Sequence, residues 1–142
     1  MNIPEMLAEG CLSKIKPDPE AIRVMMTSAE NGLQEAGRIL SEDPAKCFAC
    51  TYDAVFDSCR AYMLSQGYRT TAENDYRAVL RFCKLTLRDF HKGILDGFAA
   101  AEIKRNKATY SGLNSVNDTE AGGLLKAARI FINHIRDRLD NR

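Results

Sequence analysis

Two Asp-Pro pairs constrain the fold of this chain more than any other feature of its sequence. Asp18 with Pro19, and Asp43 with Pro44, each join a residue that caps a helix N-terminus to one that suits the first helical position. Behind each pair, apolar residues recur every three or four positions, which is the period of an amphipathic helix. The two pairs therefore predict two long helices with a short connection between them.

Apolar stripes of this kind cover most of the chain. The first two extend over residues 22–40 and 48–63, and Gly67 predicts the end of the second helix. A third stripe covers residues 76–101. It is long for a single helix, and two helices with a kink near residues 88–93 are the alternative.

Capping-box spacing marks two further helix starts. Thr70 with Glu73 opens the third stripe, and Asn117 with Glu120 precedes the last stripe of the chain. Between these two stripes, residues 105–116 are polar, and we predict that they form a loop.

The fold class follows from the stripes. Period-two alternation is almost absent, so the sequence predicts no strands. Long amphipathic helices with short connections pack as antiparallel neighbours, and we therefore expect an all-α, up-down bundle of four to five helices. Residues 1–142 suffice for a single helical domain, with residues 1–16 as a short leader segment of helical character.

Composition and charge exclude several classes of protein. The 20 Lys and Arg residues nearly balance the 19 Asp and Glu residues, so no overall positive field exists to hold duplex DNA. No stretch reaches the roughly 20 apolar residues of a membrane span. The N-terminus lacks the basic start of a signal peptide, so we expect a cytoplasmic protein whose five cysteines stay reduced.

Cysteine and histidine residues give little sign of a metal centre. Cys47 and Cys50 form a CxxC that would share one helical face, but a zinc site takes four ligands. The chain has no second CxxC and only two histidines. Packing of both thiols within a helix is the simpler interpretation, and a pair of metal ligands is the alternative. We expect no metal and no cofactor.

Two other patterns each have a structural and a functional interpretation. Gly93 and Gly97 form a GxxxG, which suits close helix packing within the chain or, alternatively, a homodimer seam. Arg129 and His134 are five residues apart and would lie about 140° apart around a helix, so they do not converge within one chain.

Cationic and amide side chains gather in one segment, which comprises Lys104, Arg105, Asn106, Lys107 and Tyr110. Cations stabilise the C-terminal end of a helix, which is the structural interpretation. The functional interpretation is a phosphate clamp. In such a clamp Arg105 offers a fork of donors, and Tyr110 offers a hydroxyl and a stacking face. Lys104 and Lys107 add point charges.

In their order and spacing, several segments resemble the HEPN family, which comprises small all-helical domains linked to nucleotidyltransferases, toxin–antitoxin pairs and RNA cleavage. The segments that carry the resemblance are residues 52–54, 67–69, 104–112, 118–120 and 127–132. The resemblance as a whole extends over most of the chain. The resemblance implies a helical bundle that forms a homodimer and binds RNA, a nucleotide or a partner nucleotidyltransferase.

The resemblance also assigns roles to single residues. Active HEPN members carry Arg, four residues and then His, and Arg105 with Asn106 matches the start of this motif. Position 110 holds Tyr110 in place of the histidine. Histidine titrates near neutrality and can accept the proton of a 2′-hydroxyl, whereas tyrosine, with an ordinary pKa of about 10, is a poor base at pH 7. Arg105 and Tyr110 are thus a degenerate catalytic pair, and His134 of a dimer partner is an alternative base.

Three functions remain open on the sequence alone. The leading hypothesis is a non-catalytic or weakly active HEPN-like module that binds RNA, a nucleotide or a nucleotidyltransferase, with Lys104, Asn106 and Lys107 as ligand-binding residues. The second is a metal-independent ribonuclease toxin of a toxin–antitoxin or defence system. The third is a structural subunit that binds no ligand.

Overall fold

The computed structural model describes residues 2–73, 75–87, 92–111 and 116–141, and for residues 92 and 105–111 it describes the backbone alone. Most of this part of the chain is helical. The elements in chain order are α1 (Ile3–Ala8), β1 (Leu12–Lys14), α2 (Pro19–Ile39), α3 (Pro44–Ser65), β2 (Tyr68–Thr70), α4 (Tyr76–Thr86), α5 (Lys92–Ser111) and α6 (Asp118–Asp140).

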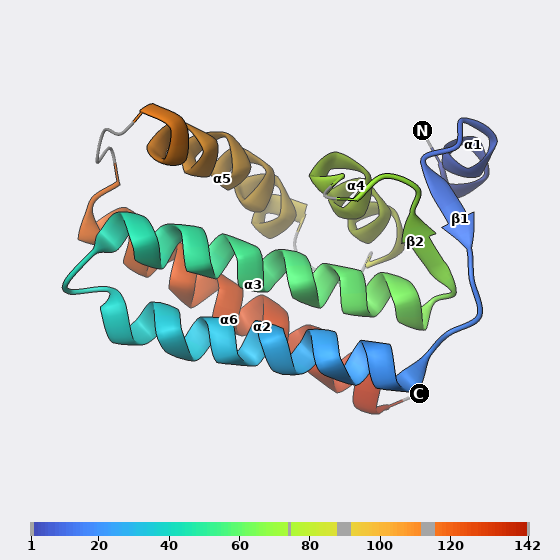
Figure 1. The fold of residues 1–142 in the computed structure, drawn as a ribbon, viewed down its shortest axis with the longest axis horizontal. Helices are drawn as coiled ribbons and strands as arrows, with labels where there is room; N and C mark the ends of the chain where they lie inside the picture. The colour runs from blue at the N-terminus through green and yellow to red at the C-terminus, as the bar shows by residue number, and fades with distance from the viewer. Residues whose placement is uncertain (1, 74, 88–91, 112–115, 142) are drawn as a thin grey trace.

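Helix α3 is the centre of the molecule. Helix α2 packs antiparallel against it, α6 packs against both, and α4 with α5 covers the opposite side of α3 (Figure 1). Because it has neighbours on several sides, α3 buries residues around most of its circumference, including Val55, Cys59 and Tyr62. The helical, antiparallel architecture predicted from the stripes is confirmed, but the described residues form six helices and not the four to five that the stripes predict.

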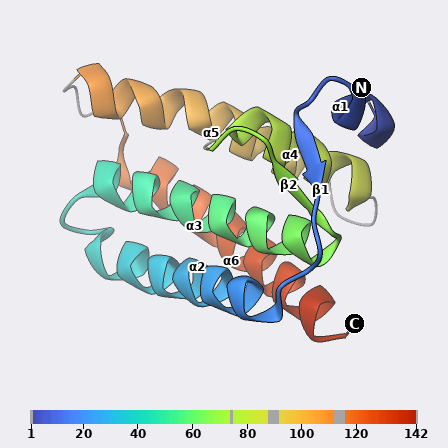
Figure 2. The ribbon, with the colours of Figure 1, turned by 45° about the vertical axis from the view of Figure 1, so that its right-hand side comes forward.

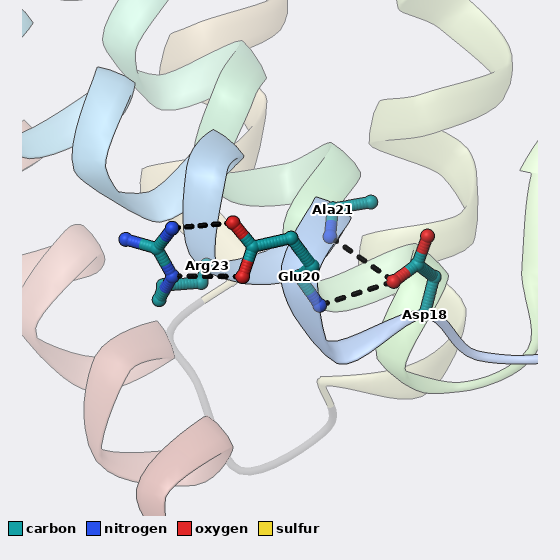
Figure 3. Close-up of polar contacts among 4 residues, drawn as sticks. All are labelled: Asp18, Glu20, Ala21 and Arg23. Carbon is teal, nitrogen blue, oxygen red and sulfur yellow. Dashed lines mark hydrogen bonds and ion pairs between the residues drawn. The ribbon is translucent and has the colours of Figure 1, made fainter.

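The start of α2 shows how the first Asp-Pro pair acts. One carboxylate oxygen of Asp18 accepts hydrogen bonds from the backbone N–H groups of Glu20 at 3.1 Å and Ala21 at 3.4 Å (Figure 3). Within the same turn, Arg23 forms an ion pair with Glu20. The cap satisfies donors that would otherwise lack a partner at the helix end, so the predicted helix start is confirmed.

The start and end of α3 also follow the sequence signals. The Asp43 carboxylate accepts from the backbone N–H of Lys46 at 3.1 Å. At the other end, α3 stops at Ser65, and Gly67 takes a φ of 88°, in the left-handed region that glycine adopts at little cost.

The expectation of a strand-free fold is wrong. Strands β1 and β2 form a two-stranded antiparallel sheet in which Leu12 lies opposite Thr70 and Lys14 lies opposite Tyr68 (Figure 2). Each strand has three residues, which is too short for alternation to be visible in the sequence. The pairing holds the N-terminal segment against the residues that follow α3. Met6 of α1 is buried in the core.

The third stripe is divided between two helices, α4 and α5. Of the residues of the predicted kink, 88–93, positions 88–91 lie outside the described part and 92–93 belong to α5. The start predicted at Thr70 is wrong, because Thr70 belongs to β2 and the cap of α4 is Asp75. The Asp75 carboxylate accepts from the backbone N–H of Ala78 at 3.1 Å.

The loop predicted for residues 105–116 is also wrong over its first part, because α5 continues to Ser111. No glycine or proline occurs in the sequence from 98 to 111, and Lys, Arg and Ala are good helix formers. Residues 112–115 lie outside the described part. Helix α6 then starts at the predicted place, since Asn117 accepts from the backbone N–H of Glu120 at 2.8 Å.

None of the helices in the described part of the chain combines the length with the apolar content that a membrane crossing requires.

Candidate functional site

The cationic segment predicted from the sequence lies at the C-terminal end of α5. The structure gives positions 104–111 a helical backbone, so this segment extends a regular helix. The side chains of Arg105, Asn106, Lys107 and Tyr110 lie outside the described part. Their contacts with one another and with a ligand therefore stay a prediction from the sequence.

Lys104 is the one member of the segment whose side chain the structure describes. Its Nζ forms an ion pair with Oε2 of Glu120, in the first turn of α6, and both side chains are about 35% exposed. The hydrogen bond from Lys104 is the main reason that the pKa of Glu120 is lowered from its ordinary value. A phosphate at Lys104 would have to compete with this carboxylate, so Lys104 adds less positive field than its formal charge suggests.

Glu120 is a residue that the sequence analysis placed only in a capping box. Its ion pair with Lys104 joins α5 to α6, and the two residues are 16 positions apart in the sequence. No local pattern indicates a pair at that separation, because it depends on how α5 and α6 pack.

An apolar groove of 530 Å³ lies beside this ion pair, between α5 and α6. Lys104 and Glu120 lie at its edge, and small residues form much of its lining, namely Gly93, Gly97, Ala100, Ala101, Gly123 and Ala127. A Cβ placed on Gly93 or Gly97 would meet no atom within 4 Å. The GxxxG pair therefore does not serve close packing among the described residues, which leaves the seam interpretation open.

In the CxxC, Cys47 belongs to the hydrophobic core, and Cys50 is partly buried and packs against that core. Cys47 is fully buried, and burial is the main cause that raises the pKa of both the Cys47 and the Cys50 thiol. Within the described residues, no three His, Cys, Asp or Glu side chains gather as metal ligands would. This arrangement favours packing as the role of the two thiols.

Arg129 and His134 lie on different sides of α6, as their spacing predicts. Arg129 lines a groove with α2, whereas His134 lines a cavity with Tyr62 and Ser65 at the end of α3. His134 is also about 21 Å of helix axis from Glu120. Within one chain it therefore cannot supply a base to the end of α5.

No protein-family model matches this chain, and no curated protein is significantly similar to it. The resemblance to the HEPN family thus depends on the residues named in the sequence analysis.

Proposed function

We propose that this chain is a HEPN-like module that binds single-stranded RNA through residues 105–110 of α5 and acts as a homodimer without efficient catalysis. The observation that carries the proposal is the position of the cationic segment. It lies at the end of a long helix, directly beyond the Lys104–Glu120 ion pair and beside an apolar groove. Arg, Lys and Tyr are the residue types that hold a nucleic-acid backbone and stack on its bases.

The neighbouring groove supports the dimer. An apolar groove with small residues on both walls admits a helix at close range. A second copy that places its α5 along this groove can bring two cationic segments to one edge. A two-fold interface of this kind pairs the same patch with itself.

The chemistry available at the segment favours binding over cleavage. RNA cleavage without a metal needs a group that takes the 2′-hydroxyl proton near neutral pH. Tyr110 stands where the active members of the resembled family carry histidine, and an ordinary tyrosine keeps its proton at pH 7. Arg105 retains the positive charge that holds a phosphate.

The test measures binding of a fluorescent single-stranded RNA over a series of salt concentrations. Removing both charges in Arg105→Ala/Lys107→Ala should weaken binding and lower the slope of log affinity against log salt by about 1.4, since each contact contributes about 0.7 for single strands. The matched control is Lys14→Ala/Lys16→Ala, which removes two exposed cations at the far side of the molecule. Equal affinities for the two double variants would refute the site.

A second measurement addresses catalysis and the dimer. The purified protein should leave the RNA intact for hours without added metal, and light scattering should give twice the chain mass. Gly97→Leu should give the mass of a single chain, because the new side chain would fill the groove. Rapid cleavage that Arg105→Ala abolishes would instead favour the ribonuclease hypothesis.

A further inference from the structure

A second groove, which is polar, lies on the side of the molecule away from α5. It has a volume of 320 Å³ and runs between α2 and α6. Its polar lining consists of Glu30, Asn31 and Gln34 from α2 and of Arg129, Asn133 and Arg136 from α6. Three of these side chains carry charge, two positive and one negative, and three carry amide or carboxamide donors.

The two arginines of the groove differ in whether an acidic or polar side chain pairs with the guanidinium group. Nη2 of Arg136 donates to Oδ1 of Asn133 at 2.8 Å, and Nη1 of Arg136 lies 3.6 Å from Oε1 of Glu30. For Arg129, by contrast, the structure gives no ion pair and no hydrogen bond with any residue it describes. The one acidic side chain of the groove is thus engaged by Arg136, and a net positive charge remains at Arg129.

The position of the Arg129 side chain depends on a glycine of the facing helix. A Cβ placed on Gly37 of α2 would lie 2.7 Å from Nη2 of Arg129, which is closer than real atoms approach. Any larger residue at position 37 would therefore displace the guanidinium. Arg129 is exposed, so its fork of donors is open to an anion that approaches along the groove.

We propose that the groove between α2 and α6 binds the phosphate group of a small ligand, and that the fork of Arg129 holds that group. Asn133, one turn away along α6, and Arg136, two turns away, supply further donors. The groove volume is in the range of small-molecule sites and admits a phosphate with a group attached to it. This site shares no residue with the α5 segment, so the failure of RNA binding there leaves it untouched.

The experiment titrates the full chain with sodium phosphate and, separately, with adenosine monophosphate at constant ionic strength. Binding is followed by the NMR shifts of the backbone amides of Gly37 and Asn133. We expect saturable shifts with both ligands. Adenosine monophosphate that binds at least about tenfold more tightly identifies a nucleotide phosphate, whereas equal affinity identifies free phosphate. No saturation, or the same shifts with sodium chloride, would overturn the proposal.

Variants distinguish the effect of the forked guanidinium donors of Arg129 from the effect of its positive charge. Arg129→Gln should weaken binding at least about tenfold, and Arg129→Lys should weaken it less, because it keeps the charge without the fork. Gly37→Ala should weaken binding although it removes no charge. Arg38→Gln on α2 is the control for charge, and Gly122→Ala, whose Cβ would meet Leu40 at an ordinary 3.7 Å, is the control for an added methyl.

The outcome is decided only on variants whose spectra show a folded chain. If Arg129→Gln does not fold, Arg129→Lys and Gly37→Ala decide. Parental affinity in those two variants would refute the role of Arg129.

Discussion

Phe131 is a residue at which packing alone sets stability. Its side chain has no exposed surface, and its ring meets that of Phe98 edge-on, with centroids 5.3 Å apart and 75° between the planes. The contact joins α5 to α6, so the loss of this ring removes buried area and leaves a cavity at the junction of two helices.

We expect Phe131→Ala to lower the free energy of unfolding by about 3–5 kcal/mol. The neighbouring Ile130, which is 53% exposed, gives the matched control, and Ile130→Ala should change it by no more than about 0.5 kcal/mol. Urea unfolding followed by circular dichroism measures both. Similar midpoints for the two variants would contradict the burial of Phe131.

Two glycines with positive φ give a second comparison at this scale. Gly67 has a φ of 88°, and a Cβ there would lie 3.3 Å from the carbonyl oxygen of Ile15. Gly10 has a φ of 80°, with no atom within 4 Å of such a Cβ. Alanine at either position should cost about 1–2 kcal/mol of backbone strain. In urea unfolding, Gly67→Ala should lower the free energy of unfolding more than Gly10→Ala, because it adds a close contact with the backbone. A larger loss of stability in Gly10→Ala would argue against the turn described at Gly67.

Between elements, the Lys104–Glu120 ion pair couples α5 to α6 in a way that depends on pH. The folded-state pKa of Glu120 is lowered, chiefly by the hydrogen bond from Lys104. Stability from this pair is therefore present at every pH above the ordinary carboxyl value of 4.5, and it is lost as the pH falls through the lowered pKa.

Glu120→Gln should thus lower the melting temperature at pH 7, and the difference from the parent should shrink below pH 4.5 and then vanish. Glu9→Gln is the control, since Glu9 is exposed and has no ion pair within the described residues. Calorimetry across this pH range measures both variants. A difference that grows toward acid pH would show that the pair does not stabilise the fold.

The elements also show what can be predicted from sequence here. Helix starts at Asp18, Asp43 and Asn117 follow from local chemistry, because the cap and the donors it satisfies lie within three residues of each other. The pairing of β1 with β2 and the contact of Lys104 with Glu120 depend on segments far apart in the chain. No pattern of period or spacing encodes such contacts, so they had to come from the structure.

The same division holds for the candidate sites. The segment of residues 104–110 stands out because its cations adjoin in sequence. The groove between α2 and α6 does not, because Gly37 and Arg129 meet only when two separate helices pack. The spacing of Arg129 and His134 correctly predicts that they lie on different sides of α6, but no sequence pattern indicates what Arg129 faces.

At the scale of the whole molecule, α3 separates the groove on α5 from the groove on α2. Figure 1 shows α4 and α5 on one side of α3 and α2 on the other. A partner on α5 therefore leaves the α2 side accessible, and the two proposed binding events can be measured independently in one preparation.

Removal of residues 1–16 tests how the leader contributes to the whole. The deletion takes Met6 and Leu12 from the core, and both are more than nine-tenths buried. At about 1.5–3 kcal/mol for each buried side chain, we expect the free energy of unfolding to fall by at least about 3 kcal/mol. Urea unfolding of the shortened chain measures this, and an unchanged midpoint would mean that α1 and β1 are dispensable.

The pairing of β1 with β2 also has a consequence for how the protein is made. The ribosome releases Leu12–Lys14 early, but the partner strand emerges only after α2 and α3 have been synthesised. Until then Met6 and Leu12 lack their cover and are open to chaperones and proteases. Leu12–Lys14 is thus kept from its native place until the whole of α2 and α3 has followed it.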